Sequence, residues 1–353
     1  MNSSAFYSSS DLGNLQPLSA AVRLAEPGLA LANGPIAMPL PHLGFLGVSG
    51  ADGLSFLHGQ LTNDVQHQSV DTVALSAYCQ AKGRMLASFV QWRDVIDGGP
   101  AVMLALSREL AAPIAKRLSM FVLRAKAKVV DRSEELVALG WIGSAGGFPP
   151  LGIDGLTLPG AAWGHTGAED VHCLRLSDQD TATGALARVV VIAPASSATA
   201  VWRALAAGST PTEEAAWHLF EVHSGIARIV APTQEQFVPQ MLNYELVGGV
   251  NFKKGCYPGQ EVVARSQYLG KLRRRMFLAR AAGIDVKAGA DVAAPGTAEP
   301  VGRVANAAPN PQGGTDLLVE TTLAAAESDL SVDGVALQML ALPYAIPAEQ
   351  GAA

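Results

Sequence analysis

The chain has few charged residues, few aromatic residues and no excess of basic residues. Charged residues make up 16% of its 353 residues and the net charge is −6, so it lacks the basic footprint of a general nucleic-acid-binding protein. We therefore expect no direct, stable nucleic-acid binding. The hydrophobic content of 49% excludes a disordered chain. At about 100–200 residues per domain, the length predicts two or three domains with ample core.

Cysteine is also scarce, with three residues at Cys79, Cys173 and Cys256. They lie far apart and form no CxxC pair, which argues against a disulfide framework and favours a reducing compartment. His172 adjoins Cys173, but zinc sites usually show paired ligand spacings. We therefore predict no metal site formed by this chain alone.

Long apolar segments and an N-terminal targeting pattern are absent as well. The first twenty residues contain no Lys or Arg and no unbroken apolar stretch, so we expect no signal peptide. No apolar run approaches about 18 residues, the length that a membrane-spanning helix needs. We predict a cytoplasmic protein with no membrane partner.

Hydrophobic patterning divides the chain into a leader and three folded parts of α+β character. Stretches with period two indicate strands, and apolar spacings of three and four indicate helices. The predicted parts are a loosely ordered leader at 1–38, a discontinuous central α+β domain at 39–130 and 210–270, a second α+β domain at 131–209, and a small antiparallel barrel or sandwich at 271–346. The last part is predicted from short alternating strands separated by Gly, Pro and Asn turns.

The segment KKGCYPGQE, Lys253–Glu261, carries the strongest chemical signal. Pro258 fits the first position of a helix, where its missing N–H costs nothing. This prediction puts Cys256 just ahead of a helix N-terminus and beside two lysines, and both factors favour thiolate over thiol. A lone cysteine is more often a small buried hydrophobe, which is our interpretation of Cys79 and Cys173. Because the neighbours here are lysine and glycine, we predict a reactive or binding role for Cys256.

Other residues near this segment have structural as well as functional interpretations. Gln260 and Glu261 are common in the first turn of a helix, and Arg265 follows Glu261 at the i,i+4 spacing of a salt bridge. The basic segment KLRRR at 271–275 is typical of a solvated face, and its alternative role is to receive the anionic tail of a folate. Trp217, on the predicted helix 212–224, is either a core residue or a stacking platform.

The segment KKGCYPGQEVVAR at 253–265 resembles the signature of the YgfZ family, folate-binding proteins that support iron–sulfur enzymes. Earlier segments resemble the same family in order and spacing: HGQLTNDV at 58–65, AKGR at 81–84, and FVPQ at 237–240 with Asn243. The resemblance extends from about residue 40 to about residue 345, which is nearly all of the predicted folded chain.

The resemblance implies the aminomethyltransferase folate-binding-like fold of the glycine cleavage T-protein, in three parts with a small C-terminal antiparallel β-barrel. It implies that tetrahydrofolate or a derivative is the cofactor. It also implies partners that are iron–sulfur client enzymes or assembly proteins, including enzymes that modify transfer RNA. It assigns the critical cysteine to Cys256. The residues that it places in the folate-binding or flanking positions are Trp217, Gln240, Lys254, Gly255, Tyr257, Gly259, Gln260, Glu261 and Arg265.

Departures from the T-protein pattern separate three functional hypotheses. Leu86 and Ala87 stand where the T-protein carries a catalytic aspartate pair, and neither side chain exchanges protons. His223 replaces a glutamate that hydrogen-bonds the pterin, and Leu43 falls near a tryptophan of the family. The leading hypothesis is therefore an accessory protein for iron–sulfur clusters, in which Cys256 acts together with partners because cluster sites need several thiolates. The alternatives are a folate-dependent one-carbon transferase and a folate-independent scaffold.

Overall fold

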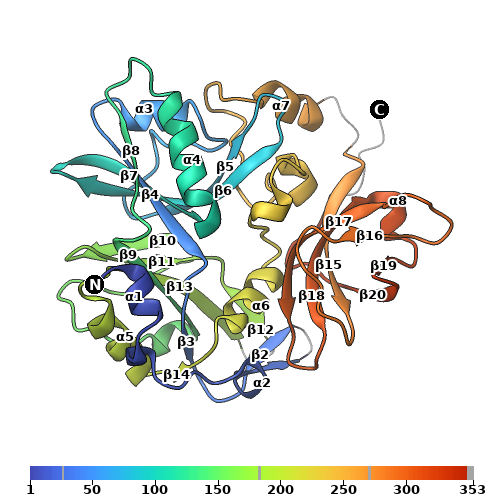
Figure 1. Cartoon of the computed structure of the whole chain (residues 1–353), viewed down its shortest axis with the longest axis horizontal. Coiled ribbons are helices and arrows are strands. Elements are labelled where there is room, and N and C mark those ends of the chain that lie inside the picture. The colour runs from blue at the N-terminus through green and yellow to red at the C-terminus, as the bar shows by residue number, and fades with distance from the viewer. Residues whose placement is uncertain (26–27, 182–183, 269–271, 348–353) are drawn as a thin grey trace. The chain divides into compact units, whose positions relative to one another are not determined.

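The structure is a computed structural model that describes residues 1–25, 28–181, 184–268 and 272–347 (Figure 1). The chain forms two compact units. The first contains Met1–Leu54, His67–Ala74 and Val90–Phe220, and the second contains Ser55–Gln66, Leu75–Phe89 and Glu221–Ala353. The division predicted from sequence, with a central domain, a second domain and a barrel, stays a prediction.

The described residues form short helices and mostly antiparallel strands. The α-helices are α1 (Ser3–Tyr7), α2 (Leu18–Ala21), α3 (Gly53–His58), α4 (Arg108–Met120), α5 (Ala198–Ala207), α6 (Ala215–His223), α7 (Gln260–Tyr268) and α8 (Leu323–Ala326). The strands are β1 (Val22–Leu24), β2 (Leu29–Leu31), β3 (Ile36–Pro39), β4 (Leu43–Ser49), β5 (Val73–Cys79), β6 (Met85–Ile96), β7 (Gly99–Ser107), β8 (Lys128–Asp131), β9 (Leu136–Gly143), β10 (Gly164–Ala168), β11 (Val171–Arg175), β12 (Gln179–Thr181), β13 (Gly184–Pro194), β14 (Thr210–Pro211), β15 (Arg274–Ala281), β16 (Asp291–Val292), β17 (Gly302–Pro309), β18 (Thr315–Thr322), β19 (Ser331–Val332) and β20 (Val335–Leu340).

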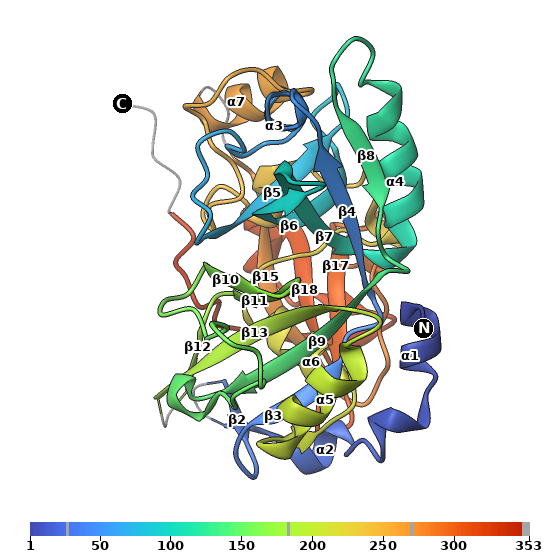
Figure 2. The ribbon, with the colours of Figure 1, turned by 90° about the vertical axis from the view of Figure 1, so that its left-hand side faces the viewer.

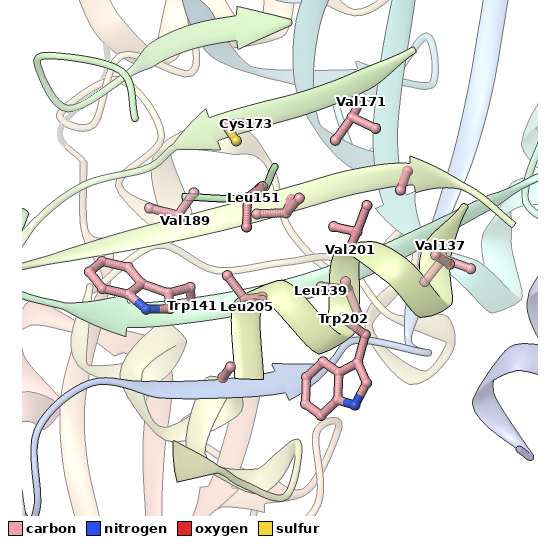
Figure 3. Packing of buried hydrophobic residues seen from close by; sticks show 14 of the residues in the cluster. Val137, Leu139, Trp141, Leu151, Val171, Cys173, Val189, Val201, Trp202 and Leu205 are labelled. Carbon is pink, nitrogen blue, oxygen red and sulfur yellow. The ribbon is translucent and has the colours of Figure 1, made fainter. Parts of the chain in front are cut away.

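The larger sheet of the first unit has the order β10-β11-β13-β9-β3-β14, with β12 paired to β13. Its longest pairing joins β13 and β9 in antiparallel register, with Val191 opposite Leu139. Helix α5 covers one face, because its buried residues recur at helical spacing and form one apolar stripe. Figure 3 shows Val201 and Leu205 of α5 beside Leu139 on the sheet. The buried hydrophobic residues between α5 and the sheet form the core of this sheet, and buried Cys173 is one of them.

A second antiparallel sheet of the first unit contains the later half of β6, then β7, β4 and β8. Helix α4 packs along β4 and β8, as Figures 1 and 2 both show. The side of α4 that is buried carries Leu110, Ile114 and Leu118, at spacings of four residues. The strand predicted at 43–48 is β4, which ends at Ser49.

The prediction of a loosely ordered leader over residues 1–38 was wrong for much of this segment. Phe6 of α1 is fully buried in the core of the larger sheet, and Leu12 and Leu15 pack against the same core. Strands β1 and β2 pair with each other. The elements here are three to five residues long, too short for a hydrophobic period to show in the sequence.

The predicted C-terminal β-barrel is confirmed in the second unit. Its antiparallel sheet has the order β16-β17-β18-β15-β20-β19. An isolated bridge between Ala293 and Ser331, with two hydrogen bonds of 2.9 Å, joins the two edges and nearly closes the sheet. Buried aliphatic residues such as Val304, Leu317 and Val319 fill the interior. Closure leaves few unpaired strand edges, which is how small antiparallel barrels avoid edge-to-edge association.

None of the helices in the described part of the chain combines the length and the apolar character needed to span a bilayer.

Candidate functional site

Cys256 is the exposed thiol of the chain, whereas Cys79 and Cys173 are buried. The two buried side chains are 1% and 0% exposed, and burial raises the pKa of each thiol to about 12. The interpretation of Cys79 and Cys173 as core residues is therefore confirmed. At neutral pH, these two thiols are protonated and inaccessible to solvent. Cys256 is therefore the thiol that can react with a partner.

The residues after Cys256 form a tight turn and not the first turn of a helix. The backbone N–H of Gln260 donates to the carbonyl of Tyr257 at 3.1 Å, and Gly259 between them has a φ of +82°. Pro at the second position and a positive φ at the third are the marks of a type II turn. The prediction that Pro258 begins the helix was wrong, because α7 begins at Gln260.

A backbone contact joins this turn to the turn between β5 and β6. A β-carbon added to Gly259 would lie 2.6 Å from the carbonyl oxygen of Gln80 and 2.7 Å from the Cα of Gly83. Gly83 itself has a φ of +76°, and a β-carbon added to it would lie 3.0 Å from the Cβ of Val262. Both glycines are therefore needed for close approach as well as for their backbone conformation. This contact brings together the sequence segments AKGR and KGCYPGQE, which are about 170 residues apart in the chain.

Replacing Gly259 with alanine is expected to lower the free energy of unfolding by about 2–4 kcal/mol, because a positive φ and a backbone clash both oppose the methyl group. Gly248→Ala is the matched control, since Gly248 has a φ of +78° but no heavy atom within 4 Å of the added carbon. We expect about 1 kcal/mol for Gly248→Ala. Urea unfolding of both variants measures the difference, and equal losses would show that the contact with Gly83 contributes nothing.

Lys254 points inward and holds the segment before Cys256 against the chain that follows α3. Its ammonium donates to the carbonyl of Leu61 at 2.7 Å and to the carbonyl of His58, and it lies 4.9 Å from the centre of the Tyr257 ring. The side chain is buried, which lowers its pKa to about 8, although nearby Asp64 and Cys256 act in the opposite direction. Lys254 thus satisfies carbonyls left open where α3 ends.

A histidine–carboxylate pair lies beside the same turn. His58 Nδ1 is 3.2 Å from Asp64 Oδ1, and both side chains are largely buried. A β-carbon on Gly255 would lie 3.7 Å from Nε2 of His58, so the imidazole edge faces the residue before Cys256. Sequence reasoning did not assign His58 or Asp64 a role, although both lie in the HGQLTNDV segment that carries the resemblance. The site therefore combines an exposed thiol, an amine with a lowered pKa and an imidazole–carboxylate pair.

Removing the ammonium of Lys254 tests whether it holds this arrangement. We expect Lys254→Met to lower the free energy of unfolding by about 1–3 kcal/mol, since two carbonyl groups would lose their partner. Lys253→Met is the matched control, because the adjacent Lys253 side chain is exposed. Its cost should stay within about 0.5 kcal/mol. Chemical unfolding of both variants provides the comparison, and an equal cost for the two would contradict the anchoring role.

Gln240 lies in the interior of the second unit. Its Nε2 donates to the carbonyl of Val263 at 2.6 Å, while its Oε1 is buried and has no hydrogen-bond partner within the described residues. Glu245 is similar: Oε1 pairs with Arg275, and Oε2 has no hydrogen-bond partner in the same described part of the chain. Burial is the main reason that the pKa of Glu245 is raised. These two oxygens are unsatisfied acceptors, which are costly unless a donor reaches them.

The remaining predicted residues on α7 are on the surface. Gln260 is half-buried, and both Glu261 and Arg265 are exposed. Within residues 184–268, no ion pair joins Glu261 to Arg265, so the predicted salt bridge is not formed. Exposed i,i+4 pairs stabilise a helix only weakly. Holding two long side chains in one geometry costs conformational entropy, and this cost offsets the small gain.

The basic segment at 271–275 is partly neutralised. Arg274 pairs with Glu320, and Arg275 pairs with Glu245. Arg273 is exposed, and Lys271 lies outside the described residues. The predicted solvated face therefore applies to Arg273 but not to buried Arg275.

Trp217 lies in the first unit and is 1% exposed. Its ring packs against Gly140, because a β-carbon added to that glycine would lie 2.8 Å from Cε3 of the indole. The guanidinium of Arg188 lies 5.2 Å from the centre of the indole ring. The structure thus gives Trp217 the packing role that was one of its two interpretations, and its contact with folate stays a prediction. Leu86 and Ala87 are buried on β6, so their side chains contribute packing and no acid–base group.

No family model matches the chain. It is 31% identical over 258 residues to the tRNA-modifying protein YgfZ of Colwellia psychrerythraea. The matched region covers 71% of this chain and 73% of that relative. It is 32% identical over 235 residues to the protein of that name from Edwardsiella ictaluri, covering 67% of this chain and 68% of that relative.

A solved structure confirms the predicted fold. The glycine cleavage system aminomethyltransferase T from Bartonella henselae superposes with a TM-score of 0.70 over 94% of this chain and 98% of that protein, at 15% sequence identity. At that identity the likeness establishes the fold alone.

Proposed function

Because the chain belongs to the YgfZ family, whose curated members are named tRNA-modifying proteins, we propose that it is a folate-binding accessory protein for iron–sulfur clusters. In this proposal it supports the assembly or repair of clusters in client enzymes, including enzymes that modify transfer RNA. The observation that carries the proposal is the single exposed thiol, Cys256, on a turn held by Lys254 and by the contact between Gly259 and Gly83.

The chemistry of one exposed thiol suits a protein that acts on a partner. Cluster sites use several thiolates, so Cys256 supplies one ligand or one nucleophile and the client supplies the rest. The imidazole of His58, paired with Asp64, lies beside the turn that carries Cys256. Lys254, whose pKa is about 8, adds a group that changes charge near neutral pH.

The same residues argue against the transferase alternative. A transferase of the T-protein type needs acid–base carboxylates, and the corresponding positions hold Leu86 and Ala87, buried on β6. No proton transfer proceeds through aliphatic side chains. The transferase hypothesis therefore has no observation in its favour beyond the fold, and fold alone does not define activity.

The donor and acceptor chemistry fits a reduced folate. A reduced pteridine ring carries several N–H donors, and Gln240 Oε1 and Glu245 Oε2 are buried acceptors without a hydrogen-bond partner among the described residues. We assign these two side chains to hold the pteridine, and Arg273 to attract the anionic tail. Bound tetrahydrofolate would supply a reduced ring able to carry one-carbon units. Gln240 and Glu245 would orient that ring and exclude water from it.

Calorimetric titration of the full chain with tetrahydrofolate tests the cofactor. We expect saturable binding at one per chain, and a loss of roughly tenfold in affinity for Gln240→Met, because one hydrogen bond is removed. Gln234→Met is the matched control, since Gln234 also donates to a backbone carbonyl, that of Leu86 at 2.8 Å, but is not assigned to the ligand. Absence of saturable binding would favour the folate-independent scaffold.

A further inference from the structure

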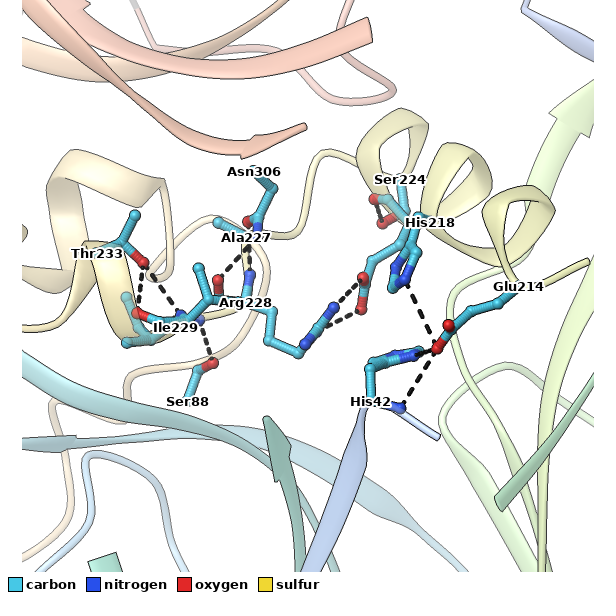
Figure 4. Close-up of polar contacts among 12 residues, drawn as sticks. His42, Ser88, Glu214, His218, Ser224, Ala227, Arg228, Ile229, Thr233 and Asn306 are labelled. Atoms are coloured by element: carbon cyan, nitrogen blue, oxygen red, sulfur yellow. Dashed lines mark hydrogen bonds and ion pairs between the residues drawn. The ribbon is translucent and has the colours of Figure 1, made fainter. Parts of the chain in front are cut away.

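Three side chains that could bind a metal converge in the first unit, outside the segment that carries Cys256. His42 directly precedes β4, Glu214 directly precedes α6, and His218 lies in the first turn of α6. Figure 4 shows the two imidazoles directed at the carboxylate of Glu214. One donor atom from each residue lies within 4.8 Å of the other two.

The geometry of this cluster comes from local structure and from one long-range contact. Glu214 and His218 are four residues apart, and the N–H of His218 donates to the carbonyl of Glu214 at 3.2 Å, so both side chains lie on one face. His42 reaches the same oxygen, Glu214 Oε1, with its ring Nδ1 and with its backbone N–H at 3.3 Å. His218 Nε2 is 3.7 Å from that oxygen, and the two rings are 4.4 Å apart.

The donor set selects a particular class of ion. Two imidazole nitrogens and one carboxylate oxygen suit borderline first-row ions such as Zn²⁺, Co²⁺ and Ni²⁺, whereas Mg²⁺ and Ca²⁺ prefer oxygen ligands. We propose that His42, Glu214 and His218 form a binding site for a divalent transition-metal ion. Three protein ligands leave an open coordination position for water or another ligand. The side chains are 14%, 29% and 26% exposed, so an ion can enter from solvent.

The ionisation of Glu214 is compatible with metal binding. Burial would raise the pKa of Glu214, but the hydrogen bond and charge of His42 and the charge of His218 outweigh burial and lower it. The carboxylate is therefore ionised at neutral pH, as a metal ligand must be. Sequence reasoning predicted no metal site, because His42 is 172 residues from Glu214 and no ligand spacing connects them.

The chain offers its own control in a second histidine pair of the first unit. His165 Nε2 lies 3.1 Å from His172 Nδ1, and His165 Nδ1 contacts the carbonyl of Val70 at 2.7 Å. His172 Nε2 is 3.6 Å from Asp94. In this pair, His165 Nε2 and His172 Nδ1 face each other, His165 Nδ1 faces a backbone carbonyl and His172 Nε2 faces Asp94, so the nitrogens point to separate partners. His165→Asn therefore removes an imidazole without touching the proposed site.

The experiment titrates Co²⁺ into the chelator-treated full chain and follows visible absorption, with Zn²⁺ added as competitor. We expect one ion per chain, displacement by Zn²⁺, and no near-ultraviolet thiolate band, with an unchanged spectrum for Cys256→Ser. Glu214→Gln and His218→Gln should each weaken binding by at least about tenfold, since even indirect partners of a metal ligand have effects of 10–100-fold. His165→Asn should bind as the unmodified chain does.

Circular dichroism before titration confirms that each variant is folded, and Glu214→Gln preserves the size and hydrogen-bonding shape of the side chain. Zn²⁺ should also raise the melting temperature of the unmodified chain but not that of Glu214→Gln, because an ion stabilises only the state that binds it. The proposal is overturned if no saturable Co²⁺ binding occurs, or if binding survives Glu214→Gln and His218→Gln. It is equally overturned if His165→Asn, and not these variants, removes binding.

Discussion

Replacing Cys256 with serine is expected to remove all rapid reaction of the native protein with a disulfide reagent. The unmodified chain should react quickly at one of its three thiols, because Cys256 is exposed and the other two are buried. A thiol with a pKa of about 12, as for Cys79 and Cys173, has roughly a thousandth of the thiolate of a free cysteine at neutral pH. Burial slows these two further, since reagent reaches them only after local unfolding.

Cys173→Ala is the matched control for this measurement. It removes a buried thiol from the core of the larger sheet, so it should lower stability while leaving the fast reaction at one equivalent. The rates are measured from the absorbance of the released reagent, with and without denaturant. A fast equivalent that persists in Cys256→Ser would show that the reactive thiol is elsewhere.

Replacing Asp316 with alanine is expected to give the largest loss of stability, about 3–5 kcal/mol, because it leaves the largely buried guanidinium of Arg280 and the buried imidazole of His223 without their partner. Asp316 of β18 is fully buried. It accepts hydrogen bonds from Arg280 at 2.6 and 2.8 Å and from Asn310 at 2.9 Å, and it lies 2.6 Å from His223 Nε2. Within the second unit, the carboxylate therefore joins His223 to the barrel.

The matched control is Asp291→Ala, which breaks a more exposed pair with Arg303 in the same barrel. Exposed pairs contribute about 0–1 kcal/mol, so this variant should unfold almost as the unmodified chain does. Denaturant unfolding followed by circular dichroism measures both. A loss below about 1 kcal/mol for Asp316→Ala would contradict the role assigned to this cluster.

The dependence of the free energy of unfolding on acid pH gives a second test of the role of Asp316. Burial would raise the pKa of Asp316, but hydrogen bonds from Arg280 and His223 outweigh it and lower the pKa to about 2. An unfolded aspartate has a pKa of about 3.9. The stabilisation from Asp316 is therefore fully present above about pH 4 and is lost as the pH falls through 2. Asp316→Asn should lack this part of the acid dependence.

Much of the fold was predictable from the sequence because strands and turns follow local rules. The barrel is an example: Asn310, Pro311 and Gly313 lie between β17 and β18 and mark a turn, although the buried positions of these two strands do not alternate. The leader was not predictable in this way. Phe6 is fully buried there, yet α1 is five residues long and shows no period.

The site was predictable in composition but not in geometry. The local pattern places both Lys253 and Lys254 beside Cys256, and only the family resemblance singles out Lys254. In the structure, Asn251 Oδ1 accepts from both backbone N–H groups, at 2.8 and 3.2 Å, and the local turn exposes one side chain and buries the other. His58 contacts Lys254 although the two residues are 196 positions apart in the sequence. No local sequence pattern predicts a contact at that separation.

The most direct test of the account is the level of methylthiolated transfer RNA in a bacterial strain that lacks its own YgfZ family member. Expression of this chain should restore the modified nucleoside, measured by mass spectrometry of digested transfer RNA. Expression of the Cys256→Ser variant at the same level should not restore it, although the variant is folded. Full restoration by Cys256→Ser would contradict the central claim that the exposed thiol carries the function.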